Sequence, residues 1–216
     1  MNARNSDFAI SPMPLFYQQD INEHTRFGLW KIEESPDFFQ EFVPVSREIS
    51  HPHKRLQHLA GRYLLRQLFP DFPMEMILIA DTRKPFLADE SFHFSISHCG
   101  NWAAAIVSRN ERVGIDVESS SPRIMRVVAK FLDSSETDLI LEQKVELSAT
   151  LLWSAKESMY KWYEGGGIDF SEHLRLLPFN WGDEGVIPAR FLKNRVQNLT
   201  VHYKIWDGLC LSWVLG

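Results

Sequence analysis

The chain's clearest chemical feature is a short segment, residues 113–118, in which apolar and acidic residues alternate. Successive side chains of a strand point to opposite faces, so the apolar residues can be buried while Asp116 and Glu118 lie together on the other face. Two carboxylates on one rigid strand form half of a site for a hard cation, which prefers oxygen ligands. Gly114 leaves room for a ligand or another backbone to approach. The same alternation is also typical of a half-buried strand with a solvated face.

A further carboxylate lies on the strongest predicted helix, Leu147–Glu164, whose apolar residues recur at spacings of three and four. Glu157 and Lys161 lie four residues apart on one face of this helix, and Lys156 is adjacent to Glu157. Such a Glu–Lys pair is usually a surface ion pair, but the same cation could recruit the glutamate. The glycines at residues 165–167 are expected to end the helix.

Basic residues suited to an anion occur on an earlier helix and in a turn. The helix predicted over His53–Phe69 has one apolar stripe and carries Arg55 and Arg62 on the opposite face. The long arm and forked donors of arginine suit a phosphate, although a solvated basic face explains the same pattern. Lys84 precedes a proline, which holds its backbone extended. It is therefore either a positioned cation or an ordinary surface lysine of a turn.

Two strands, predicted over Phe92–His98 and Trp102–Ser108, precede the acidic segment and are expected to form a three-stranded meander with it. The meander would bring Ser97 and His98, near the end of its first strand, next to the two carboxylates. A lone histidine at a strand end is more often a hydrogen-bonded structural residue.

Composition excludes several classes of protein. The chain has 216 residues, 44% of them hydrophobic, with seven Trp and fifteen Phe, as expected of a packed globule. Its net charge of −5 does not favour nucleic acid or an anionic membrane as partner. Residues 1–21 are polar, so we expect no signal peptide, and no apolar run is long enough to span a bilayer. Cys99 and Cys210 lack metal or redox spacing, which favours free thiols in a reducing cytoplasm.

The order of elements predicts the architecture. A helix, a hairpin and sheet strands occur once before Asp116 and once after it, which suggests two similar halves that face each other. We predict an α+β fold of two halves, residues 1–114 and 115–216, related by a pseudo-two-fold. Each half would combine a small antiparallel sheet with a long helix. The other predicted elements are two helices and a hairpin, over residues 123–131, 133–144 and 198–214.

Two motifs in this order resemble a known family. The segments GIDVE, residues 114–118, and WSAKESMYK, residues 153–161, are similar to the signature pair G-[IV]-D-x-E and W-x-x-K-E-[SA]-x-x-K of the Sfp-type 4′-phosphopantetheinyl transferases. Three further segments agree, at residues 54–62, 84–86 and 94–98. Two positions depart from the family's pattern: Arg83 replaces a frequent glycine, and Cys99 replaces a small polar residue.

The resemblance implies an enzyme of the holo-[acyl-carrier-protein] synthase type. It would transfer the 4′-phosphopantetheine group of coenzyme A to a serine of an apo carrier protein and release adenosine 3′,5′-bisphosphate. Asp116, Glu118 and Glu157 match the positions that hold Mg²⁺, and Mn²⁺ also accepts oxygen ligands. Glu157 would act as the base for the serine hydroxyl, either directly or through a metal-bound water. Lys161 and Lys156 match the basic catalytic positions that follow the metal site.

The resemblance also implies where coenzyme A and the carrier would bind. The first half would form the nucleotide side of a cleft, with Ser97, His98, Arg55 and Lys84 around the adenosine phosphates and Arg62 as a less direct match. The second half would hold the metal and the catalytic residues. It would dock an acidic acyl or peptidyl carrier protein through the basic residues of the helix at 123–131, which are Arg123, Arg126 and Lys130.

Two other interpretations remain open at this point. One is a metal-dependent phosphodiesterase that uses the same carboxylates, although such sites usually hold two metals. The other is a module that binds a carrier protein and coenzyme A without transfer. The sequence does not distinguish fatty-acid, polyketide and nonribosomal-peptide carriers. Two halves in one chain would make a monomer sufficient.

Overall fold

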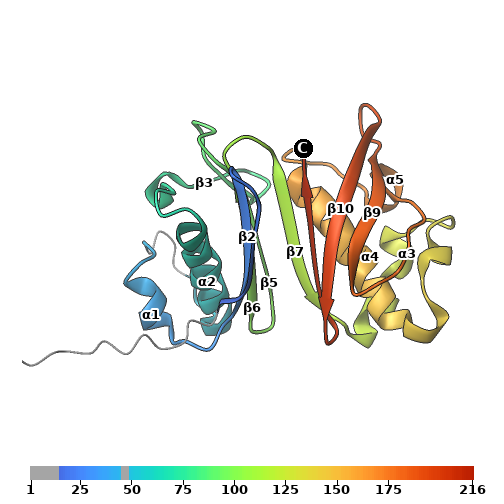
Figure 1. The fold of residues 1–216 in the computed structure, drawn as a ribbon, viewed down its shortest axis with the longest axis horizontal. Helices are drawn as coiled ribbons and strands as arrows, with labels where there is room; N and C mark the ends of the chain where they lie inside the picture. The colour runs from blue at the N-terminus through green and yellow to red at the C-terminus, as the bar shows by residue number, and fades with distance from the viewer. Residues whose placement is uncertain (1–14, 45–48) are drawn as a thin grey trace, which may run out of the picture.

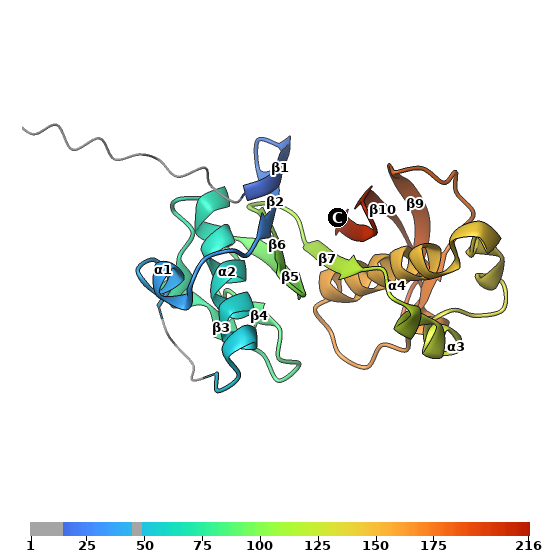
Figure 2. The ribbon, with the colours of Figure 1, turned by 90° about the horizontal axis from the view of Figure 1, so that it is seen from below.

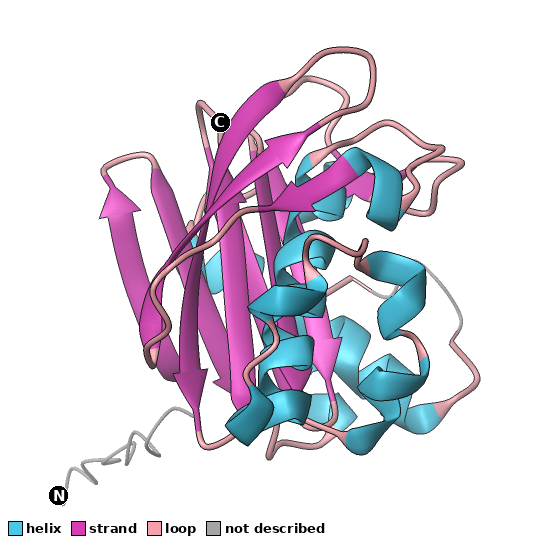
Figure 3. Cartoon of the chain, turned by 90° about the vertical axis from the view of Figure 1, so that its right-hand side faces the viewer, coloured by secondary structure: helices cyan, strands magenta, loops and turns pink. Residues whose placement is uncertain are grey.

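Each half of the chain forms an antiparallel sheet with one long helix on its outer face, and the two sheets pack face to face (Figure 1). The structure, a computed structural model, describes residues 15–44 and 49–216, so most of the polar segment 1–21 lies outside the described residues. The layers run helix, sheet, sheet, helix, which the view from below also shows (Figure 2). Seen from the side, the long strands gather toward one side and most helices toward the other (Figure 3). The predicted α+β fold class is confirmed.

The first sheet has the strand order β1-β2-β6-β5. Its strands are β1 (Leu15–Asn22), β2 (Thr25–Lys31), β5 (His93–Cys99) and β6 (Trp102–Ser108). Helix α2 (Pro52–Leu68) covers its outer face, and the short helix α1 (Pro36–Gln40) packs against α2. Between α2 and β5 the chain forms a 3₁₀ turn and a small hairpin, η1 (Met74–Met76), β3 (Leu78–Ile79) and β4 (Pro85–Phe86).

The second sheet has the strand order β7-β11-β10-β9-β8. Its strands are β7 (Val113–Ser119), β8 (Leu174–Leu176), β9 (Glu184–Phe191), β10 (Gln197–Trp206) and β11 (Leu209–Leu215). Helix α4 (Val145–Trp162) covers its outer face, and the short helix α5 (Phe170–His173) leads into β8. The predicted long helices and the C-terminal hairpin are confirmed. In the described part of the chain, no helix has both the length and the apolar character that crossing a bilayer requires.

Strand β7 belongs to the second sheet, and the meander predicted for it with β5 and β6 is wrong. β7 pairs with β11, and its free edge lies against β5, the edge strand of the first sheet. The N–H of Ile115 donates to Ser95 Oγ at 3.2 Å, and the N–H of Ser119 donates to Cys99 Sγ at 3.4 Å. The meander was expected because consecutive strands usually pair. The predicted boundary between the halves falls inside β7.

The two helices predicted between β7 and α4 form only in part. Residues 123–131 are divided into η2 (Pro122–Arg126) and α3 (Val128–Phe131). Over residues 133–144 the chain makes two 3₁₀ turns, η3 (Thr137–Leu139) and η4 (Glu142–Lys144). A side chain does cap the start of this segment, because Glu136 Oε2 accepts a hydrogen bond from the N–H of Asp133 at 3.0 Å. The helix does not continue, because the backbone is extended at Ile140.

Gly114 allows α4 to approach β7 at backbone distance. A Cβ at this position would lie 2.0 Å from the carbonyl oxygen of Ser158 and 2.6 Å from the backbone nitrogen of Trp162. The predicted close approach at Gly114 is therefore confirmed, and the approaching group is a helix backbone. Because α4 and β7 both carry acidic residues of the predicted site, this contact sets the position of one group relative to the other.

Lys156 points into the interior of the second half and is not brought to the other predicted site residues, so its catalytic role stays a prediction. Its Nζ donates to Glu136 Oε2 at 2.7 Å, to the carbonyl oxygen of Phe131 at 2.6 Å and to that of Phe170 at 3.0 Å. The side chains of Lys156 and Glu136 are both 0% exposed. Glu136 Oε1 accepts in turn from the N–H of Leu176 at 2.7 Å. The pair thus ties α4 to the irregular segment before it and to β8.

We expect Gly114→Ala to destabilise the protein by about 3 kcal/mol, the upper end of the cost of overpacking a core, because backbone atoms of α4 must move. Chemical denaturation measures this difference. Gly166→Ala is the matched control: its Cβ would meet only a side-chain methyl of Thr82 at 3.4 Å, so a change below about 0.5 kcal/mol is expected. Equal stability of the two variants would contradict the close packing at Gly114.

We expect Lys156→Met to lower the free energy of unfolding by about 3–5 kcal/mol, because it leaves the buried Glu136 carboxylate without its cation. The same substitution in the exposed Lys31–Glu33 pair should cost at most about 1 kcal/mol. Urea denaturation of both variants tests the difference. A Lys156→Met protein of unchanged stability that has lost only its activity would support the catalytic interpretation instead.

Candidate active site

Asp116 is the centre of a hydrogen-bonded group that joins the two halves. The carboxylate is 2% exposed, and its Oδ1 accepts from Ser97 Oγ of β5 at 2.8 Å and from Lys161 Nζ of α4 at 2.7 Å. Lys161 Nζ also donates to Ser97 Oγ at 2.8 Å. The structure therefore brings together three residues that the sequence placed on separate elements, and it does so across the contact between β5 and β7.

The other two predicted metal ligands, Glu118 and Glu157, share the electrostatic environment of Asp116. Burial raises the pKa of Glu157 to about 7, and the charges of Asp116 and Glu118 add to the rise while Lys161 opposes it. Burial also raises the pKa of Glu118, again with a contribution from Asp116. Neighbouring carboxylates that are partly removed from water disfavour one another's ionised form. A nearby cation would relieve this repulsion.

One oxygen of Asp116 lacks a partner. Asp116 Oδ2 is buried and, within the described residues, accepts no hydrogen bond. Leaving a buried charged acceptor unsatisfied is costly, so this oxygen is a candidate ligand for a cation. No set of three His, Cys, Asp or Glu side chains in residues 15–44 and 49–216 is already gathered as a metal site. The orphaned oxygen and the three mutually repelling carboxylates nevertheless fit a hard divalent cation.

The predicted nucleotide contacts are distributed unevenly around this centre. His98 lies near the end of β5 and its side chain is exposed. Its pKa is lowered because surrounding protein atoms displace part of the water around the ring and because Lys161 is positively charged. Arg55 Nη2 donates to Gln40 Oε1 on α1 at 2.8 Å. Arg62 is only 8% exposed, and its Nη1 lies 2.9 Å from His58 Nδ1 on α2. Neither arginine is brought to the carboxylates, so their contact with phosphate stays a prediction.

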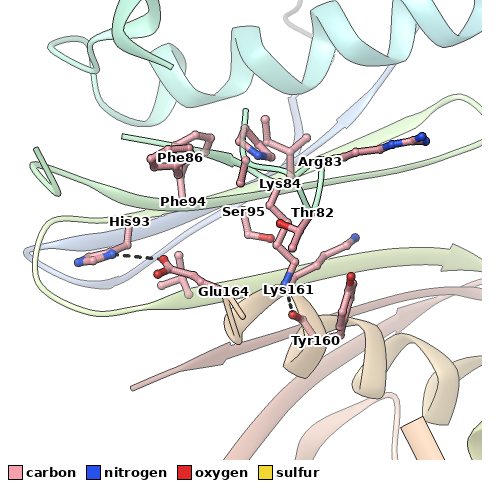
Figure 4. A pocket seen from close by; sticks show the side chains of 14 residues that line it. Thr82, Arg83, Lys84, Phe86, His93, Phe94, Ser95, Tyr160, Lys161 and Glu164 are labelled. Atoms are coloured by element: carbon pink, nitrogen blue, oxygen red, sulfur yellow. Dashed lines mark hydrogen bonds and ion pairs between the residues drawn. The ribbon is translucent and has the colours of Figure 1, made fainter. Parts of the chain in front are cut away.

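A pocket of about 390 Å³ opens between the halves, and Lys161, which donates to Asp116, is one of its lining residues (Figure 4). The hairpin β3–β4 and strand β5 supply one wall, and the last turn of α4 supplies the other. Two residues that the sequence predicted to bind anions or to act in catalysis therefore line one pocket, Lys84 from the first half and Lys161 from the second. Most of the surface that lines the pocket is apolar, and Phe86, Phe94 and Ile96 contribute to it.

The sequence did not identify two residues of this pocket, Tyr160 and Glu164. Lys84 Nζ lies 4.0 Å from the centre of the Tyr160 ring, and Glu164 Oε1 lies 3.9 Å from His93 Nδ1. Tyr160 lies inside the segment 153–161 and Glu164 lies three residues after it, and their spacing of four would place both on one face of the predicted helix. This spacing could have pointed to the two residues, but other residues of the predicted helix Leu147–Glu164 share the same spacing, so it does not single out one face.

Comparison with known sequences supports the resemblance over the second half of the chain. The model of the 4′-phosphopantetheinyl transferase superfamily matches residues 112–213. This range contains Asp116, Glu118, Glu157 and Lys161, whereas Lys84, Ser97 and His98 lie before it.

Named relatives agree with this match. Enterobactin synthase component D of Salmonella austin is 36% identical over 111 residues, which is 50% of this chain and 47% of the relative. The 4′-phosphopantetheinyl transferase psf-1 of Bacillus pumilus is 32% identical over 121 residues, 52% of this chain and 51% of the relative. Enterobactin synthase component D of Escherichia coli strain K12 is 26% identical over 182 residues, 79% of this chain and 82% of the relative.

The chain thus spans about half the length of the first relatives that it matches. The matched range nevertheless contains the acidic residues and the lysine that form the centre of the site. By sequence, the second half of the chain, with its three carboxylates and Lys161, matches the 4′-phosphopantetheinyl transferase superfamily.

Proposed function

We propose that this chain transfers the 4′-phosphopantetheine group of coenzyme A to a serine of a carrier protein, with release of adenosine 3′,5′-bisphosphate, and that it is of the Sfp type. The observation that carries the proposal concerns Asp116. One of its oxygens accepts hydrogen bonds from Lys161 and Ser97, and the other has no partner in the part of the chain that the structure describes. It lies inside the range that matches the superfamily.

The residues would hold one cation, and each has a role in the transfer. Asp116, Glu118 and Glu157 would bind Mg²⁺, which supplies neutralisation of charge on the pyrophosphate. Glu157 would take the proton of the serine hydroxyl. The serine oxygen then forms a bond with the phosphorus of phosphopantetheine, and the bond from that phosphorus to the bridging oxygen breaks. Lys161, whose Nζ already lies beside Asp116, would stabilise the negative charge of the departing bisphosphate.

The direction of α4 supports an order of binding sites. Lys161 and the pocket lie toward the end of the helix, where Lys84 would contact the nucleotide. The exposed His98 lies outside the pocket lining, near the other end of β5, and would contact the nucleotide from there. Trp153 lies one turn before Glu157 and contacts Phe131 of α3, with ring centres 5.1 Å apart. The acceptor serine would therefore approach from the side of α3 and η2.

The surface at η2 suits an acidic carrier. Arg123, Arg126 and Lys130 are exposed, and Met125 is 40% exposed among them. Basic charge attracts an acidic partner over a distance, and an apolar side chain provides contact area when the partner docks. We include a cytoplasmic location in the proposal, since Cys99 and Cys210 are free thiols, and a monomer, since one chain supplies both halves of the site.

Given coenzyme A, Mg²⁺ and an apo carrier, the protein should add one phosphopantetheine group to the carrier and release an equal amount of bisphosphate, and EDTA should stop the reaction. Asp116→Asn should reduce turnover at least about a hundredfold, because it removes a charge from the proposed cation site. Asp71→Asn, which changes an exposed carboxylate paired with Arg109, should leave turnover unchanged. Mass spectrometry of the carrier and chromatography of nucleotides measure both products.

The outcomes of this assay separate the alternatives. Bisphosphate released without carrier would indicate a phosphodiesterase. Bound coenzyme A without transfer to fatty-acid, polyketide or peptide carriers would indicate a binding module. Full activity of Asp116→Asn at low Mg²⁺ would contradict the proposed metal site.

Arg126→Glu should slow transfer about tenfold at low carrier concentration and low salt, and the difference should shrink as salt screens the charge. Affinity for coenzyme A should not change. Arg66→Glu, a charge reversal at an exposed position of α2, is the matched control and should transfer normally. Equal rates for the two variants at every salt concentration would show that the carrier docks elsewhere.

A further inference from the structure

The end of α4 is the feature from which we draw a further inference. The last carbonyl groups of an α-helix have no partner within the helix, and a glycine in the left-handed conformation commonly satisfies them. The glycines at residues 165–167 were predicted to do this, but α4 ends at Trp162 and its cap residue Tyr163 has extended backbone, with φ −80° and ψ 108°. Helix α4 therefore ends without a glycine cap.

A lysine from the first half supplies the missing donors. Lys84 Nζ donates to the carbonyl oxygen of Tyr160 and, at 2.5 Å, to that of Tyr163. The residues are 76 and 79 positions apart in sequence, so the contact crosses from one half to the other. A cation is also favoured at a helix C-terminus, where the partial charges of the carbonyl groups are negative.

The position of Lys84 is fixed by its own turn. The N–H of Arg83 donates to Ala80 O at 2.8 Å, and the N–H of Ala80 donates to Lys84 O at 2.9 Å. Arg83 has φ 65°, a left-handed conformation that closes the turn between β3 and β4. Pro85 then restricts the backbone of Lys84. Figure 4 shows the side chain extending from this turn across the pocket to Tyr160.

The amine of Lys84 makes its two hydrogen bonds to the end of α4 in a partly buried environment, not on the open surface. Lys84 is partly buried over the Tyr160 ring, and burial lowers its pKa to about 8, although the charges of Glu164 and Glu157 oppose this. Burying an amine is unfavourable unless its hydrogen bonds are satisfied. The two carbonyl oxygens and the ring face supply that compensation.

We propose that Lys84 is a positioning residue, which caps α4 from the opposite half and thereby fixes the helix turn that carries Glu157 and Lys161. Lys161 is adjacent to Tyr160, and Glu157 lies one turn earlier, so fraying of the helix end would displace both from Asp116. The link to catalysis rests on the proposed function, whereas the capping does not.

The competing explanation is that Lys84 only binds a phosphate of coenzyme A, as the resemblance implies. A phosphate contact alone would affect the KM for coenzyme A and would leave the free protein unchanged. A cap acts before any ligand binds, so it should alter the dynamics of α4 and the turnover at saturation.

The test compares Lys84→Met, which keeps an apolar stem but removes the donors, with Lys84→Arg, which restores them. Lys193→Met is the matched control, since Lys193 also donates to two carbonyl oxygens, those of Gly166 and Gly167, and lies 5.7 Å from the ring centre of Tyr163. It contacts the loop after α4 from within the second half and does not cap the helix.

Hydrogen exchange is measured first, without coenzyme A or metal. In Lys84→Met, the amides of residues 160–163 should exchange at least about tenfold faster, because the end of the helix opens more often. They should be unchanged in Lys193→Met and restored in Lys84→Arg. Unchanged exchange in Lys84→Met would overturn the proposal whether or not the protein is a transferase. If Lys84→Met does not fold, Lys84→Gln, whose side chain is too short to span the same gap, serves with the same expectation.

Turnover is measured next, at saturating coenzyme A and per folded protein. The proposal expects kcat of Lys84→Met to fall about tenfold and Lys84→Arg to recover most of it. A raised KM with unchanged kcat would overturn the positioning role in favour of phosphate binding alone. If even the unmodified protein transfers nothing, the proposed function fails, while the exchange result still decides whether Lys84 caps α4.

Discussion

The site depends on the hydrogen-bonded group formed by Ser97, Asp116 and Lys161. Ser97 belongs to the first sheet, Asp116 to the second, and Lys161 to the helix behind it, so one carboxylate oxygen holds three layers in register. The second oxygen of Asp116 is buried and has no partner among residues 15–44 and 49–216. A buried carboxylate that is half satisfied is unfavourable in isolation. It becomes useful where a cation is to be bound, because the remaining lone pairs are already oriented and desolvated.

Two lysines of one short motif serve different purposes, and their position on the helix explains why. Lys156 and Lys161 are five residues apart on α4, so they lie on different faces. Lys156 is enclosed with Glu136 and stabilises the second half, whereas Lys161 reaches the contact between the halves. Within a sequence motif, a basic residue can thus have a structural role next to a residue with a chemical one.

The features that the sequence predicted well are those governed by local patterns. The apolar spacing of α2 and α4 and the alternation in β7 depend on nearby residues. Gly114 indicated a close approach, but that the approaching backbone is Ser158 and Trp162 of α4 was not readable from the residues around it. The orientation of Lys156 was not predictable because its partner Glu136 lies in a segment whose helical appearance was misleading. The pairing of β7 with β11 was equally hidden, since the same alternation of side chains suits β6 or β11 as neighbour. The capping of α4 by Lys84 requires knowledge of how two distant segments meet.

The meeting of β5 and β7 has a consequence for solubility as well as for the site. Both are edge strands, and an uncovered strand edge offers its backbone groups to other chains, which favours aggregation. Here the hydroxyl of Ser95 and the thiol of Cys99 accept from backbone N–H groups of β7, so side chains of β5 cover part of the edge of β7. Separation of the halves would therefore dismantle the site and expose that strand edge at once. Selection against aggregation and selection for the site then act on the same contact.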